Sequence, residues 1–139
     1  MPVILPTKER VKQINIYVIQ NSTDPNEDTS DAGKFFNERY LDDALNPCFE
    51  YQTVFEAAYG LAYAIAGLNV FFNGNKRTAT RTVIETCNGN SLNFNGDNTA
   101  LVKLVNSLVK TNKNDANDDD DDDEKLKNDF ITGISELFT

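Results

Sequence analysis

The chain has 139 residues, which suits one small domain, and its lack of histidine excludes histidine-dependent catalysis and argues, with only Cys48 and Cys87 as cysteines, against a zinc site. Its net charge is −9, but eight of its 22 acidic residues lie between Asp115 and Glu124, which leaves 14 acidic against 13 basic residues elsewhere, a charge of −1. A body this close to neutral argues against general nucleic-acid binding, which needs a basic face.

The first helix is predicted to begin after Pro6, with Thr7 as its N-cap. Its apolar face continues through Val11, Ile14 and Val18. Residues 14–19 are rich in residue types that favour β-strands, so a strand is the alternative. The good cap and the lack of a partner strand favour a helix. A polar loop follows at residues 21–33, and it is either a mobile segment or a recognition loop.

A short apolar helix is predicted from Phe35 to Leu45, stopped near Asn46-Pro47 because a residue before proline avoids the helical region. A longer apolar helix follows over Tyr51–Leu68. Its apolar positions recur at helical spacing, at Val54, Ala58, Leu61, Ile65 and Leu68. This longest apolar stretch falls short of a bilayer span, and no targeting segment precedes it, so we expect a cytoplasmic protein with free thiols and no membrane contact.

A second central helix is predicted over Arg77–Cys87, closed by Asn88-Gly89, where glycine can take the left-handed cap conformation. The turn between the two central helices is Asn73-Gly74-Asn75, since glycine and asparagine accept a positive φ at little cost. Lys76 follows at once, so it and Arg77 fall in the first turn of the second helix, where the dipole is already positive. A bound anion would compensate this concentration of positive charge, so the pattern predicts a phosphate-binding site. The alternative is an ordinary link between two helices.

The C-terminal third continues the helical pattern. A connector over Ser91–Phe94 leads to a turn and cap at Asn95–Asp97, and the next amphipathic helix carries Leu101, Leu104, Val105 and Leu108. We therefore predict an all-α fold with one helical domain over residues 1–112. Residues 113–124 are predicted to be an acidic, disordered spacer, and residues 125–139 a C-terminal amphipathic helix that packs on the domain or on another chain.

The motif Asn69-Val-Phe-Phe-Asn-Gly-Asn-Lys-Arg-Thr-Ala79 resembles the signature of the Fic/Doc (death-on-curing) family, usually His-x-Phe-x-Asp-(Gly/Ala)-Asn-(Gly/Lys)-Arg. Its Lys-Arg-Thr-Ala ending is typical of the Doc-like branch. The segment Tyr40–Pro47 and the pair Ala57-Ala58 followed by Ile65 also look like that family's chain before the motif. The resemblance covers roughly residues 33–110, which makes it a match at the level of a domain.

The resemblance implies a role for each motif position. Gly74, Asn75, Lys76 and Arg77 fit the loop that binds the phosphates of ATP or a related nucleotide, and Phe71 fits the core anchor. Asn69 stands where the family has its catalytic histidine, and Asn73 where it has the carboxylate that holds Mg²⁺. An amide cannot act as a general base, so catalysis should be impaired, and Mg²⁺ would be held weakly. The flap that aligns a target in the family would lie near Pro47–Gln52.

Two further positions bear on the choice of activity. Thr80 stands where members that transfer AMP carry a second arginine, and Arg81 comes one residue too late, so AMP transfer is particularly in doubt. The stretch Thr132–Glu136 faintly resembles the family's self-inhibitory signature, but Leu137 breaks it. Covering the core is therefore the preferred role for this last helix.

Three functions remain open on the sequence. The chemistry favours a pseudoenzyme that keeps the phosphate loop and binds a nucleotide or a partner. The alternative is an active transferase that moves phosphate or AMP from ATP to the hydroxyl of a target protein, as the toxin of a toxin–antitoxin pair. The third is an interaction domain without a ligand.

Overall fold

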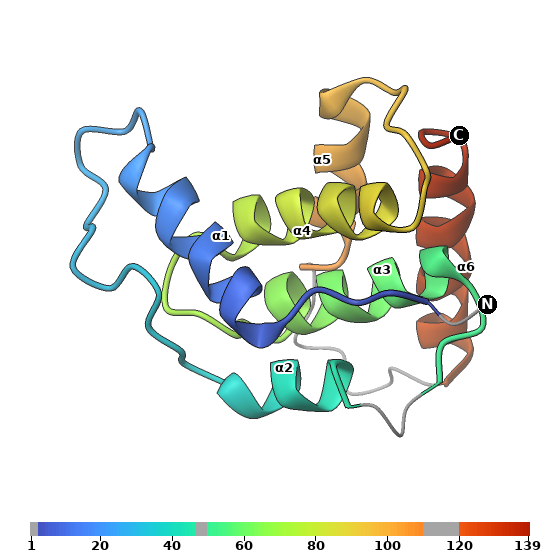
Figure 1. Cartoon of the computed structure of the whole chain (residues 1–139), viewed down its shortest axis with the longest axis horizontal. Helices are drawn as coiled ribbons and strands as arrows, with labels where there is room; N and C mark the ends of the chain where they lie inside the picture. Colours follow the sequence, from blue (N-terminus) through green and yellow to red (C-terminus); the bar gives the residue numbers. More distant parts are fainter. Residues whose placement is uncertain (1–2, 47–49, 110–119) are drawn as a thin grey trace.

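The computed structural model describes residues 3–46, 50–109 and 120–139 (Figure 1). Within these ranges the chain forms helices and contains no strand, so the predicted all-α class is confirmed. The elements are α1 (Lys8–Gln20), α2 (Glu38–Ala44), α3 (Val54–Ala62), the π-helical turn η1 (Tyr63–Gly67), α4 (Asn75–Gly89), α5 (Asn98–Ser107) and α6 (Asp120–Ser135). Across the same ranges, no helix combines the length and the apolarity needed to cross a bilayer.

Helices α3 and α4 lie at the centre and pack against each other, and α1 packs against α4 (Figure 1). α2 packs against η1 and α3, α5 against α4, and α6 against α3 and α5. The largest fully buried side chains come from all of these helices and from the link between α3 and α4: Ile14, Ile19, Leu41, Leu61, Ile65, Phe71, Val83, Leu101, Phe130 and Ile134. All of these except Ile14 and Ile19 belong to one continuous apolar core, which holds the link between α3 and α4 in place.

Side-chain caps fix the beginnings of three helices. The hydroxyl of Thr7 accepts a hydrogen bond from the backbone N–H of Arg10 at 3.0 Å, so the predicted cap of α1 is confirmed, and with it the choice of helix over strand. Thr53 caps α3 in the same way, and the carboxylate of Asp97 caps α5 as predicted. In α1 the buried face contains Ile19, whereas Val18 is only partly buried.

The C-terminal end of α4 differs from the prediction. α4 runs through Gly89, and the left-handed conformation falls instead on Ser91, with φ of 71°. The side chain of Asn90 explains the difference, because its amide exchanges two hydrogen bonds, both of 2.8 Å, with the backbone of Ile4. The helix end is thus closed by the N-terminal segment, a long-range contact.

The C-terminal helix packs on the domain, which is one of the two arrangements predicted; the other was packing on another chain. Phe130 and Ile134 on α6 are buried in the common core. Beyond the helix, Phe138 forms an antiparallel bridge with Phe94, and the two rings lie 5.2 Å apart. The last turn of chain is therefore fixed to the connector between α4 and α5.

Residues 113–119 of the acidic spacer predicted over residues 113–124 lie outside the described residues. α6 begins at Asp120, so the last five residues of that spacer are helical. Asp123 and Glu124 come just after the first turn, near the positive end of the helix dipole, which gives a physical reason for a helical start within the acidic tract. Cys48 and the first three residues of the expected flap at 47–52 also lie outside the described ranges.

Candidate functional site

The chain enters the candidate site through an irregular helical turn. In η1 and just after it, the N–H of Leu68 donates to the carbonyl of Tyr63 at 3.0 Å, and that of Val70 to Ile65 at 3.3 Å. Both bonds span five residues, the spacing of a π-helix. Asn69 follows in the left-handed region, with φ of 54°, and its side chain is exposed. Such local irregularities occur frequently at functional sites.

Phe71 anchors the loop that follows. Its side chain is 1% exposed, and its ring stacks on that of Phe35 at 5.0 Å. The two residues also form an antiparallel bridge, flanked by a 2.7 Å hydrogen bond from the N–H of Phe36 to the carbonyl of Val70. The structure therefore places Phe71 in the core, where the resemblance would put it.

Gly74 is the residue at which the loop becomes helix α4. It has φ of 73°, in the left-handed region that suits glycine. A Cβ at this position would lie 3.0 Å from Cγ1 of Ile19 and 3.3 Å from Nδ2 of Asn15. Both the backbone conformation and the close approach of α1 therefore require glycine here, which agrees with the predicted turn.

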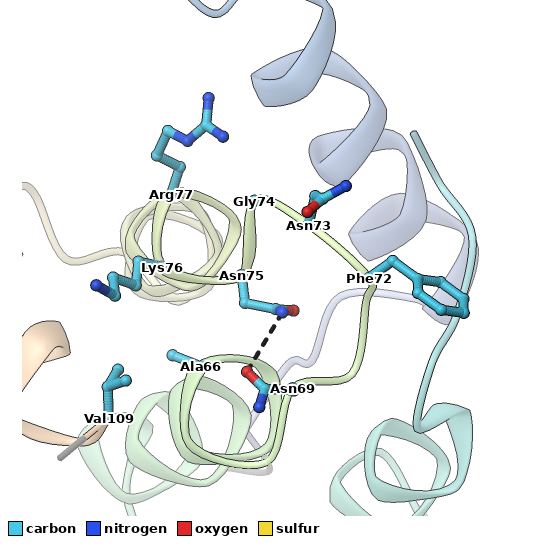
Figure 2. A pocket seen from close by; sticks show the side chains of 9 residues that line it. All are labelled: Ala66, Asn69, Phe72, Asn73, Gly74, Asn75, Lys76, Arg77 and Val109. Carbon is cyan, nitrogen blue, oxygen red and sulfur yellow. Dashed lines mark hydrogen bonds between the residues drawn. The ribbon is translucent and has the colours of Figure 1, made fainter. Parts of the chain in front are cut away.

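The amide of Asn75 is used within the loop. Its oxygen accepts from the N–H of Phe71 at 2.9 Å, and its nitrogen donates to the carbonyl of the same residue at 2.8 Å. A third, longer bond of 3.5 Å reaches the amide oxygen of Asn69 (Figure 2). This side chain therefore fixes the loop geometry, so that only its backbone N–H is left to meet a ligand.

The two cations of the motif point in different directions (Figure 2). Arg77 donates to the carbonyl of Val18 at 3.0 Å and forms a 2.9 Å ion pair with Glu27, a residue of the polar loop. Lys76 is exposed and makes no ion pair with any residue in the described ranges. Of the two predicted phosphate-binding side chains, Lys76 is therefore the one not committed to the protein itself.

A pocket of about 300 Å³ lies over this loop. It is lined by Ala66, Asn69, Phe72, Asn73, Gly74, Asn75, Lys76, Arg77 and Val109 (Figure 2). The structure thus brings every predicted polar motif position to one pocket. None of these lining residues has a carboxylate, a thiol or a hydroxyl, so the polar side chains of the pocket are amides and cations only.

This lining does not fit the Mg²⁺ site that the resemblance implies. Mg²⁺ is usually held by at least one carboxylate together with phosphate oxygens. Asn73 provides only a neutral amide, and Figure 2 shows its side chain directed away from Lys76. The described residues also contain no group of three or more acidic, histidine or cysteine side chains able to hold a metal ion.

Two residues that shape the site were missed in the sequence. Asn15 is fully buried on α1, where its oxygen accepts from the N–H of Gly33 at 2.8 Å, and its nitrogen donates to the carbonyl of Asn73 and the hydroxyl of Thr78. An asparagine within the apolar side of α1 is the signal that could have indicated it. Glu27 gives no such signal, because nothing in a polar loop distinguishes one carboxylate from its neighbours.

Comparison of the chain with protein-family models, with curated proteins and with solved structures gives no significant match. The resemblance to the Fic/Doc family therefore depends only on the motif and on the neighbouring residues named in the sequence analysis.

Proposed function

We propose that this protein binds a phosphate-bearing ligand, ATP or a related nucleotide, at the N-terminus of α4, and that it acts as a catalytically impaired, Fic/Doc-like binding protein. One observation carries the proposal. Helix α4 begins with no side-chain cap and no acidic residue in its first turn, although two cations lie there and a pocket opens over it.

The other helices show why this beginning is unusual. α1, α3 and α5 each have a capping side chain, and α2 has an acidic residue in its first turn. The N–H groups of the first turn of any helix have no partner within the helix. At α4 these groups coincide with Lys76, so a bound phosphate would satisfy the N–H groups and neutralise the cation at once.

The pocket chemistry favours binding over transfer. Transfer to a hydroxyl requires a group that accepts the hydroxyl proton, and Asn69 has no usable basicity near neutral pH. Loss of a general base typically lowers a rate by ~10²–10⁴. The mismatch with Mg²⁺ further weakens the case for the alternative, an active transferase.

Isothermal titration calorimetry with ATP tests the proposal. We expect the parent protein to bind, and Lys76→Ala to weaken binding about tenfold through loss of a charge-assisted contact. Lys125→Ala is the matched control, because Lys125 is an exposed lysine on α6, where it pairs with Asp129. A Lys76→Ala protein that binds ATP as tightly as the parent would place the ligand elsewhere.

A further inference from the structure

Two phenylalanine rings are exposed beside the candidate pocket. Phe36 is 57% exposed and Phe72 is 50% exposed, and their rings meet edge to face with centroids 5.0 Å apart. Only two other large apolar side chains are this exposed in the described ranges, Ile4 and Tyr17. Half-exposed phenylalanine is unfavourable in water, so a paired exposure next to a pocket requires a reason.

Backbone hydrogen bonds join the two segments that carry this ring pair. The N–H of Phe36 donates to the carbonyl of Val70 at 2.7 Å, and the N–H of Phe72 donates to the carbonyl of Lys34 at 3.3 Å. The neighbouring residues Phe35 and Phe71 turn inward and stack in the core. Successive residues of an extended segment point to opposite sides. Since Phe35 and Phe71 point into the core, Phe36 and Phe72 must point outward.

The ring pair lies at the opposite end of the pocket from Lys76, the cation proposed to bind phosphate. Phe72 is itself a lining residue. In Figure 2, Phe72 and Lys76 lie on opposite sides of the Asn69–Asn75 pair. Phe72 therefore lies at one end of the pocket and Lys76 at the other, with neutral amides between them, and the Phe72 ring projects outward from the loop, away from Lys76.

We propose that Phe72, supported by Phe36, stacks on the base of the bound nucleotide and so selects nucleotides over other phosphate-bearing ligands. This inference rests on the proposed function, because it names the residue that would bind the base of the same nucleotide whose phosphates bind at α4. A nucleotide has the matching order of groups: a planar base, a polar sugar and an anionic phosphate. Two rings form a small patch compared with the several hundred Å² of a typical protein-docking surface, which favours a single planar group as the occupant.

The test compares ATP with inorganic tripolyphosphate, which has the same chain of three phosphates without the base and the ribose. We expect the parent to bind ATP more tightly than tripolyphosphate. Phe72→Leu keeps an apolar side chain but removes the aromatic face, and should weaken ATP binding about tenfold without changing tripolyphosphate binding. Tyr17→Leu is the control, since Tyr17 is an exposed aromatic residue that does not line this pocket.

The other outcomes separate the two proposals. Equal affinity of the parent for ATP and tripolyphosphate, or equal weakening of both by Phe72→Leu, would overturn the role of the ring and leave the phosphate site standing. Binding of neither compound would overturn both proposals. A dimer of the parent in sedimentation velocity that Phe72→Leu dissociates would show that the rings instead contact a second copy.

Discussion

The guanidinium of Arg77 lies 2.9 Å from the carboxylate of Glu27, so the arginine expected at the phosphate is held by the loop between α1 and α2. The side chain of Glu27 is only 16% exposed, whereas that of Arg77 is 42% exposed. A ligand phosphate that recruited Arg77 would have to displace this carboxylate. Glu27 is thus a competitor of the ligand within the chain.

Removing the competitor should strengthen ligand binding. We expect Glu27→Gln to tighten ATP binding by roughly three- to tenfold, because a neutral amide holds Arg77 less strongly than a carboxylate does. Asp28→Asn changes the net charge equally in the same loop and should have little effect. Equal gains from the two variants in calorimetry would show that overall charge, and not the release of Arg77, is responsible.

Much of this arrangement could be predicted from local sequence. The caps at Thr7 and Asp97, the turn at Gly74 and the buried stripe of α6 depend on nearby residues, and the structure confirms them. Two of the failures involve contacts between distant parts of the chain. Closure of α4 by Ile4 and capture of Arg77 by Glu27 join residues 86 and 50 positions apart, which no local pattern encodes.

Asn15 should be essential for stability. Its replacement by leucine would leave the buried N–H of Gly33 and the partly buried carbonyl of Asn73 without their partner. We expect the free energy of unfolding, measured in urea, to fall by about 2–3 kcal/mol. Asn21→Ala is the control, since that amide makes one exposed bond at the end of the same helix and should cost under about 0.5 kcal/mol. Similar losses for both would contradict the role given to Asn15.

The buried threonines of α4 should respond in opposite directions. The hydroxyls of Thr82 and Thr86 are buried and have no hydrogen-bond partner among the described residues, whereas that of Thr78 accepts from Asn15. Thr82→Val removes an unsatisfied polar group, so we expect the protein to become more stable by about 1 kcal/mol. Thr78→Val should destabilise it by a similar amount. Thermal unfolding of both variants would reveal the sign, and destabilisation by Thr82→Val would imply an unseen partner.

Two glycines, the N-cap Gly74 and the last residue Gly89 of α4, offer a matched comparison. Gly74→Ala forces a side chain into the left-handed region against Ile19 and should cost about 1–2 kcal/mol of stability. Gly89→Ala adds a Cβ that meets nothing within 4 Å, and should stabilise the helix by about 0.5–1 kcal/mol. Urea unfolding distinguishes the two. If Gly74→Ala were neutral, the loop would not need its present conformation.

The parent protein should not transfer phosphate or AMP, whereas Asn69→His should recover part of that activity. Histidine, like asparagine, tolerates the left-handed region, and position 69 is exposed, so the variant should fold. Adding Asn73→Asp should raise the rate further by supplying a carboxylate for Mg²⁺. The measurement is labelled transfer from ATP to proteins in a cell extract, with Asn69→Gln as a control that lacks a base. A parent as active as the double variant would show that the base lies elsewhere.

The π-helical turn at Tyr63–Gly67 has a consequence for comparison with other chains. A π turn is equivalent to an α-helix that contains one inserted residue. A relative with an uninterrupted α-helix here would reach the position of Asn69 with one residue fewer. If the two sequences were aligned on the apolar positions of α3 without a gap, their motifs would then be out of register by one residue. Any search for relatives through this helix should therefore allow a single-residue gap between Tyr63 and Gly67.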